Sequence, residues 1–176
     1  MKFGDLLLEK ETSIVKQWFE VLMATYSSDT AKFFCNLKDD FANPVGSTSF
    51  KSVKNLFAGL IREKDHEALR SCLAPVMRIR TVQTIFTPSQ AAGFIFDLKK
   101  IVKKSLKKEL KDSSIQKELE QFYFKIDSLA LIAFDLFVEF KEQIYQLKVD
   151  TERNKIYKAF RRAGLVSDIT DDQPGL

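Results

Sequence analysis

The stretch that decides the fold runs from Ser113 to Ala163 and reads SSIQKELEQFYFKIDSLALIAFDLFVEFKEQIYQLKVDTERNKIYKAFRRA. Its apolar residues recur in steps of three and four, which is the spacing of one face of an α-helix. This first set comprises Leu119, Phe122, Ile126, Leu129, Ala133, Leu136, Phe140 and Leu147. The pattern therefore predicts one long helix that packs a continuous face against the rest of the protein.

A second apolar set lies beside the first and consists of Phe124, Leu131, Phe134 and Phe137. Together the two sets make the helix apolar almost all round between residues 129 and 140. A helix that is apolar on every side is typical of a buried position. We therefore expect this helix to be the central, buried helix of an all-α domain.

Capping signals mark both ends of the long helix. Asp112, Ser113 and Ser114 are expected to cap its start, with Gln116 completing a capping box if Ser113 is the cap. Gly164 is a typical residue just beyond a helix end. We expect one helical domain over residues 1–166, because 176 residues match the length of a single domain. Residues 167–176 are acidic, and we expect them to form a disordered tail.

Composition favours the same fold class. Hydrophobic residues make up 45% of the chain, which is enough for a sizeable core. Sixteen Phe residues against one Trp indicate that the aromatic rings serve mainly as core material. Sparse glycine and proline favour long helices, so we predict an all-α, single helical bundle. The net charge of +4 permits a basic patch without requiring a nucleic-acid partner.

The sequence indicates no metal, cofactor or catalytic centre. Cys35 and Cys72 are isolated, and together with the single histidine, His66, they cannot complete a four-ligand zinc site without carboxylates. A glycine-rich phosphate loop and the HExxH and GxSxG signatures are absent. The N-terminal run from Leu6 to Leu8 is too short for a signal sequence, and no run reaches the roughly 20 apolar residues of a membrane span. We therefore expect a cytoplasmic protein that is not an enzyme.

The first third of the chain shows two helical segments around an irregular one. Apolar spacing predicts helical packing over residues 3–26, with a break near Glu11 and a new start capped by Thr12 or Ser13. Residues 27–46 are expected to be irregular and to end in a turn at Asn43–Pro44. One of Ser47, Thr48 and Ser49 should then cap the next helix.

The middle of the chain carries the clearest start signal. Asp65 is expected to cap a short helix that Pro75 ends, and residues 76–86 fit either a helix or an extended connection. Thr87, Pro88 and Gln90 have the residue types of an N-cap, a first helical position and a capping-box partner.

Lysines dominate the outer side of the helix that Thr87 starts. They are Lys99, Lys100, Lys103, Lys104, Lys107, Lys108 and Lys111. Such a face is either simply solvated or able to contact phosphates and anionic surfaces. A nucleic-acid partner is not expected, because the aromatic residues that stack on bases are missing there.

Asp135 is unusual because it lies in the most apolar part of the long helix. A buried carboxylate must be paired to keep its charge. Arg78 and Arg80 also lie among apolar residues, so we hypothesise that one of them pairs with Asp135. The alternative is that Asp135 lies on an exposed edge of the helix.

Five short motifs occur in order along the chain: DFANPVG (40–46), RIRTVQ (78–83), TPSQA (87–91), AFD (133–135) and EQIY (142–145). This ordered set resembles the N-terminal domain of the RsbRD-type co-antagonists, a bacterial stress-regulator family of RsbT antagonists. The matching signature residues are Asp40, Asn43, Pro44, Gly46, Arg78, Arg80, Gln83, Pro88, Gln90, Asp135 and Glu142. We expect the first two motifs to form an internal brace, because their apolar neighbours Phe41, Val45, Ile79 and Val82 favour burial.

The resemblance implies a helical sensory or scaffolding domain with a globin-like fold, without haem, that dimerises. In relatives of the same pathway this domain projects from a large cytoplasmic assembly, the stressosome. There a linker helix joins it to a STAS domain, which carries the phosphorylatable residues. The present sequence ends just after the corresponding helix, so we expect a free-standing copy that acts through its own surfaces.

These observations favour a non-enzymatic regulatory, sensory or scaffolding domain in bacterial stress or signal regulation. It would act by contact with a protein partner, such as a regulator, a kinase or a complex, and as a homodimer through the long helix or the N-terminal one. One alternative is a small-molecule sensor with an apolar pocket. Another is a binder of nucleic acid or an anionic surface through the lysine-rich face.

Overall fold

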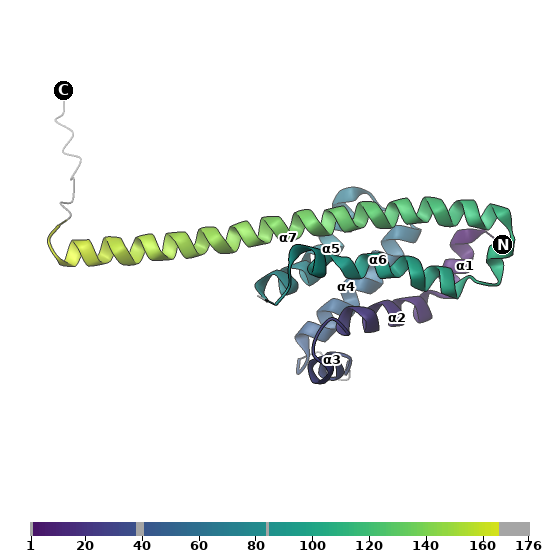
Figure 1. Cartoon of the computed structure of the whole chain (residues 1–176), viewed down its shortest axis with the longest axis horizontal. Helices are drawn as coiled ribbons and strands as arrows, with labels where there is room; N and C mark the ends of the chain where they lie inside the picture. The colour runs from purple at the N-terminus through teal and green to yellow at the C-terminus, as the bar shows by residue number, and fades with distance from the viewer. Residues whose placement is uncertain (1, 38–40, 84, 166–176) are drawn as a thin grey trace, which may run out of the picture. The chain divides into compact units, whose positions relative to one another are not determined.

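The structure is a computed structural model that describes residues 2–37, 41–83 and 85–165. Within these ranges the chain forms α-helices, one short 3-10 helix and no strand. In chain order they are α1 (Phe3–Glu9), α2 (Glu11–Met23), α3 (Ser28–Phe34), α4 (Pro44–Ile61), α5 (His66–Val82), α6 (Pro88–Ser105), η1 (Glu109–Lys111) and α7 (Ser113–Arg162) (Figure 1). The prediction of an all-α helical bundle with one long C-terminal helix is confirmed. The expected tail over residues 167–176 lies outside the described ranges.

The chain divides into two compact units, residues 1–140 and residues 141–176. The first unit contains α1 to α6, η1 and the first part of α7. The second contains the remainder of α7, which is helical as far as Arg162. Ile144 is half-buried, whereas the other large apolar side chains described there are exposed, namely Tyr145, Leu147, Val149, Ile156, Tyr157, Phe160 and Leu165.

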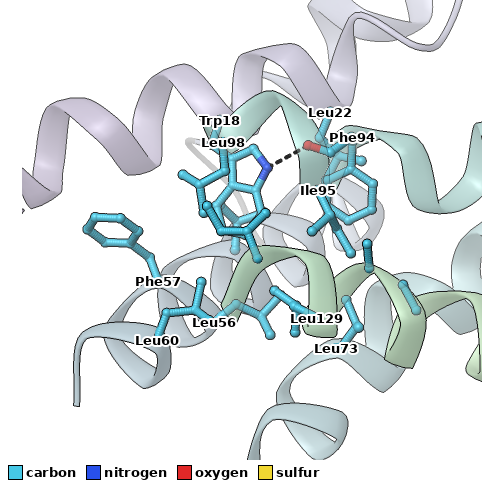
Figure 2. Packing of buried hydrophobic residues seen from close by; sticks show 14 of the residues in the cluster. Trp18, Leu22, Leu56, Phe57, Leu60, Leu73, Phe94, Ile95, Leu98 and Leu129 are labelled. Carbon is cyan, nitrogen blue, oxygen red and sulfur yellow. Dashed lines mark hydrogen bonds between the residues drawn. The ribbon is translucent and has the colours of Figure 1, made fainter. Parts of the chain in front are cut away.

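Trp18 of α2 lies at the centre of the core of the first unit. Its side chain is fully buried, and its indole Nε1 donates a hydrogen bond to the Phe94 carbonyl oxygen of α6 at 2.9 Å. A tryptophan can be buried completely when its N–H has such a partner. Figure 2 shows the apolar side chains that pack around this pair, among them Leu22, Leu56, Phe57, Leu60, Leu73, Ile95, Leu98 and Leu129.

Two of the helix starts follow the sequence signals. Asp65 caps α5, with its Oδ1 accepting a hydrogen bond from the Ala68 backbone N–H at 2.8 Å. Thr87 caps α6, and Gln90 returns the bond by accepting from the Thr87 backbone N–H at 3.0 Å. Both predicted caps are therefore confirmed.

The predicted starts of α2 and α4 are wrong by a few residues. The chain breaks at Lys10 and α2 begins at Glu11, so neither Thr12 nor Ser13 is its cap. α4 begins at Pro44 behind the cap Asn43, and the three candidate capping residues 47–49 lie inside the helix. Asn43 accepts the hydrogen bond of the Gly46 N–H at 2.9 Å, so no later cap is needed.

α7 begins at Ser113, so its cap is the first of the three expected capping residues, Asp112. Asp112 Oδ1 accepts a hydrogen bond from the Ser114 backbone N–H at 2.8 Å, which is the bond of a capping side chain. Gln116 does not complete a capping box with Ser113. It donates instead to the Leu110 carbonyl oxygen at 2.6 Å, which ties the first turn of α7 to η1.

Two further sequence expectations failed in the middle of the chain. The segment expected to be irregular contains α3, whose last carbonyl groups are bonded by Asn43 of the following helix. Pro75 does not end α5, which continues to Val82. Pro75 is exposed, while Leu73, Val76 and Met77 on the opposite side are buried in the core. Core packing on that side outweighs the cost of one lost helical hydrogen bond.

The expectation that α7 is buried on every side is also wrong. Its first apolar set is buried as far as Phe140, and Phe137 of the second set is buried as well. The remainder of the second set and one more residue are exposed, namely Phe124, Leu131, Phe134 and Val138. We call these four residues the apolar stripe. The neighbouring helices cover only one side of α7, so residues apolar enough for a core remain at the surface.

Candidate functional site

Asn43 joins α3 to α4. Its side-chain Nδ2 lies within hydrogen-bond distance of three backbone carbonyl oxygens, those of Phe33 at 3.2 Å, Phe34 at 2.9 Å and Asn36 at 2.9 Å. Its Oδ1 accepts from the Gly46 N–H. Asn43 is buried, so these bonds satisfy groups that have little access to water. The residue holds the corner between the two helices.

Gly46 is required by the same corner. A Cβ atom at this position would lie 2.1 Å from the Phe34 carbonyl oxygen and 2.4 Å from Asn43 Nδ2. The first contact is with backbone, which cannot rotate away. Only glycine therefore allows α3 and α4 to approach this closely.

Arg80 is a fully buried arginine on α5 that bonds to α6 and to the turn after α2. Its Nε donates to the Ala91 carbonyl oxygen at 2.9 Å, and its two terminal nitrogens donate to the Gln90 carbonyl oxygen and to Thr25 Oγ1, each at 3.0 Å. Its guanidinium also lies over the Phe86 ring, 3.9 Å from the centroid. Burial lowers the pKa of the Arg80 guanidinium. We call Asn43 and Arg80 the brace residues.

Tyr26 and Gln83 complete the surroundings of Arg80. The Tyr26 hydroxyl donates to Gln83 Oε1 at 2.8 Å, and the Tyr26 ring packs edge-on against Phe34 and Phe86. Burial raises the pKa of the Tyr26 phenol, against the opposing effect of the Arg80 charge. No sequence signal indicated that Tyr26 packs beside Arg80, because Tyr26 lies outside all five motifs.

The hypothesis that Asp135 pairs with Arg78 or Arg80 is wrong. Asp135 is exposed, and among the described residues it forms no ion pair. Arg80 has its hydrogen bonds elsewhere, and Arg78 stacks on Phe140 with its guanidinium carbon 4.8 Å from the ring centroid. The helix face that carries Asp135 has no cover within the described chain, so its carboxylate can remain hydrated without a partner.

The remaining signature residues are divided between helix ends and surfaces. Pro88 and Gln90 start α6, and Glu142 is exposed in the second unit. Asp40 lies outside the described residues. The expectation of burial was wrong for Phe41, which is 96% exposed, and for Val82, which is exposed at the end of α5. The internal hydrogen bonds of these motifs come from polar residues, among them Asn43, Arg80 and Gln83.

The seven lysines were expected to form a single helix face, and this expectation is wrong. α6 ends at Ser105, so Lys107, Lys108 and Lys111 lie in the following turn and in η1. Lys99 pairs with Asp127 of α7 at 2.6 Å, and Lys100 pairs with Asp97 at 3.1 Å. The other five are exposed and form no ion pair with residues that the structure describes; they are Lys103, Lys104, Lys107, Lys108 and Lys111.

The apolar stripe is the most unusual surface of the first unit. Phe124 is 72% exposed and Leu131 is 68% exposed, while Phe134 and Val138 are less so. From Phe124 to Val138 the stripe extends about 21 Å along the helix axis. Exposed large apolar side chains that share one side of a helix are characteristic of interaction sites.

One edge of the apolar stripe is fixed by contacts between α6 and α7. Lys99 Nζ forms the ion pair with Asp127, and the Tyr123 hydroxyl donates to the Lys99 carbonyl oxygen at 3.3 Å. Phe96, one turn before Lys99 on α6, is also exposed. The stripe is therefore presented on a helix that two polar contacts hold in place.

The described residues contain no group of three or more histidine, cysteine or acidic side chains that could hold a metal ion. His66 is exposed at the start of α5, Cys35 is exposed and Cys72 is half-buried. None of the helices that the structure describes has the length and hydrophobicity needed to cross a membrane.

Comparisons with protein-family models, with curated proteins and with solved structures found no match for this chain. The resemblance to the RsbRD-type N-terminal domain and the expected globin-like arrangement therefore stay predictions. In the first unit, the brace residues Asn43 and Arg80 hold helix ends together, and the apolar stripe of α7 faces outward.

Proposed function

We propose that this protein is a non-enzymatic regulatory module that acts by protein–protein contact, and that a second copy of the chain covers the apolar stripe. The exposed stripe on α7 is the observation that carries the proposal. Its side chains are as large and apolar as those of the core, yet they are exposed to solvent in the part of the chain that the structure describes. Burying them against a partner would be favourable by the same hydrophobic effect that forms the core.

The spacing of the apolar stripe supports a second copy as the occupant. Phe124, Leu131 and Val138 are each seven residues apart, with Phe134 between the last two. A seven-residue repeat keeps one side of a helix facing a helix that packs alongside it. Two identical stripes can meet in a twofold arrangement, because the same patch on both chains is complementary to itself.

The N-terminal helices are less suited to this contact. The apolar residues of α1 and α2 are mostly buried inside the first unit, and Leu8 is the one large apolar side chain of α1 that is exposed. The lysine-rich region offers charge but little apolar surface. Stress or signal regulation in bacteria is the pathway that the family resemblance suggests for such a dimer.

Light scattering of the purified protein tests the dimer. At micromolar concentration we expect about twice the chain mass of 20.3 kDa. The variant Leu131→Glu should be a folded monomer, because a charge placed in the contact must be desolvated. Leu147→Glu is the matched control, since Leu147 is equally exposed but lies in the second unit.

A monomeric wild type would overturn the proposed dimer, and so would a Leu147→Glu monomer combined with a dimeric Leu131→Glu. The pathway needs a separate experiment. Affinity capture of the tagged protein from its native cell extract should recover a kinase or a STAS-domain protein if the resemblance holds. Recovery of the bait alone would count against the adaptor role while leaving the dimer intact.

A further inference from the structure

A cavity of about 350 Å³ opens between α4, α5 and α7. Leu60, Leu69 and Ile132 form its apolar surface, and the first and last of these are buried core residues. The remaining lining comes from Gly59, Glu63, Lys64, His66, Lys125 and Ser128. Its volume falls in the range of small-molecule sites, which combine mostly apolar walls with a few polar groups.

The polar rim of this cavity contains more nitrogen groups than carboxylates. Lys64, His66 and Lys125 contribute the nitrogens, and Glu63 contributes the one acidic side chain of the lining. Glu63 forms an ion pair with Lys125, which joins the α4–α5 corner to α7. The hydrogen bond from Lys125 lowers the pKa of the Glu63 carboxyl. A carboxylate thus already occupies the place beside Lys125.

The backbone of Glu63 is held in an unfavourable conformation. Its φ of 53° lies in the left-handed region, and no other non-glycine residue that the structure describes has a positive φ. Lys64 N–H donates to the Gly59 carbonyl oxygen at 3.0 Å, which is the helix-ending bond that usually has glycine at the position of Glu63. A glutamate here costs conformational energy, and such outliers occur frequently at binding sites.

The ion pair separates this cavity from a smaller one of about 130 Å³. Leu60, Glu63 and Lys125 line both of them, and the smaller one continues towards Phe3 and Leu7 of α1. If the Glu63 side chain turned outward, Lys125 would be available from the larger cavity. The strained residue therefore lies at the point where the two spaces meet.

We propose that this cavity binds a small amphipathic carboxylate, whose apolar body lies on Leu60, Leu69 and Ile132 and whose carboxylate replaces that of Glu63 beside Lys125. The apolar floor selects the body, and the ammonium groups of Lys125 and Lys64 select the negative head group. The site goes beyond the proposed dimer and does not depend on it, because none of its lining residues belongs to the apolar stripe.

Methyl NMR of the full chain, with octanoate as the probe, tests the site. Octanoate should shift the methyl signals of Leu60, Leu69 and Ile132 in a saturable way, with a dissociation constant of about 1 mM. Octanol, which has the same chain without the charge, should bind about fivefold more weakly, as expected for one partly exposed ion pair.

Variants separate the apolar and the charged parts of the site. Lys125→Ala should remove the preference for octanoate over octanol, and Glu63→Gln should strengthen octanoate binding because it frees Lys125. Ser128→Phe should block both probes by filling the cavity, and Ser114→Phe is its exposed control on the same helix. Absence of saturable shifts at these methyl groups would overturn the proposal. Equal binding of octanol and octanoate to the wild type would overturn the carboxylate assignment.

Discussion

The brace residues and the apolar stripe reverse the usual distribution of side chains in opposite ways. Arg80 and Asn43 are polar and buried, whereas Phe124 and Leu131 are apolar and exposed. Buried polar groups and exposed apolar patches are the two informative departures from an ordinary globular protein. The first kind has its hydrogen-bond partners inside the chain, and the second kind is exposed to solvent among the residues that the structure describes.

This difference indicates which region is structural and which is available for function. Arg80 donates hydrogen bonds to α6 and to Thr25 in the turn after α2, so its removal should lower the stability of the fold. Leu131 contributes little to the core, so its replacement should weaken the proposed dimer more than it destabilises the fold. Substitutions that compare the two regions should separate stability from association.

The largest contrast is expected between two neighbouring phenylalanines of α7. Phe122 is buried against Phe3, with ring centroids 5.7 Å apart, whereas Phe124 is exposed in the apolar stripe. Phe122→Ala should lower the free energy of unfolding by about 3–5 kcal/mol because it opens a cavity. Phe124→Ala should change it by less than about 0.5 kcal/mol at concentrations where the protein is monomeric. Urea denaturation measures both, and equal losses would mean that the stripe is part of the core.

Arg80→Ala should have the next largest effect. It leaves a cavity and removes the hydrogen bonds to two carbonyl groups and Thr25, so the unfolding free energy should fall by about 3 kcal/mol. Arg78→Ala is the control, because it loses one exposed stacking contact on Phe140, worth up to about 1 kcal/mol. A folded Arg80→Ala protein of unchanged stability that fails to associate would move Arg80 from the brace to an interaction surface.

Asn43→Ala should cost less than Arg80→Ala. The change removes the cap of α4 and leaves carbonyl groups at the end of α3 without a donor, which together should cost about 2 kcal/mol. Asn55→Ala, at an exposed position within α4, should cost almost nothing. Thermal unfolding followed by circular dichroism distinguishes them, and similar melting curves would show that α3 is held by other contacts.

The smallest effect is expected at Glu63. Glu63→Gly relieves the left-handed backbone but loses the Lys125 ion pair, so stability should stay the same or rise slightly. Glu63→Ala loses the ion pair and keeps the strained φ, so it should melt below Glu63→Gly. If the two variants melt in the opposite order, backbone strain is not what distinguishes this position.

Much of the fold could be predicted from local signals. The caps at Asp65 and Thr87 and the length of α7 follow from residue types and spacing, because these depend on interactions within one helix. Local signals wrongly predicted a helix end at Pro75 and an irregular segment at residues 28–34, because both helices are stabilised by contacts with other elements. The buried side chains of Leu73 and Val76 stabilise α5 around Pro75, and the hydrogen bonds of Asn43 stabilise the end of α3.

The candidate sites were less predictable. The motifs drew attention to Asn43 and Arg80, but spacing could not show that both would be buried or that Asp135 would remain exposed. No local pattern in the residues around Glu63 marks a left-handed backbone. The cavity beside it is lined from three helices, so no single stretch of the sequence contains it.

The sequence by itself determined the all-α class, the long helix and the helix starts at Asp65 and Thr87, because hydrophobic periodicity and capping are local properties. The tertiary structure decided which side of α7 is covered, since that depends on how many helices pack against it. Apolar residues of α7 with similar helical spacing therefore differ in burial. The first set is buried in the first unit as far as Phe140, whereas the apolar stripe remains exposed because the described chain has no further helix to cover it.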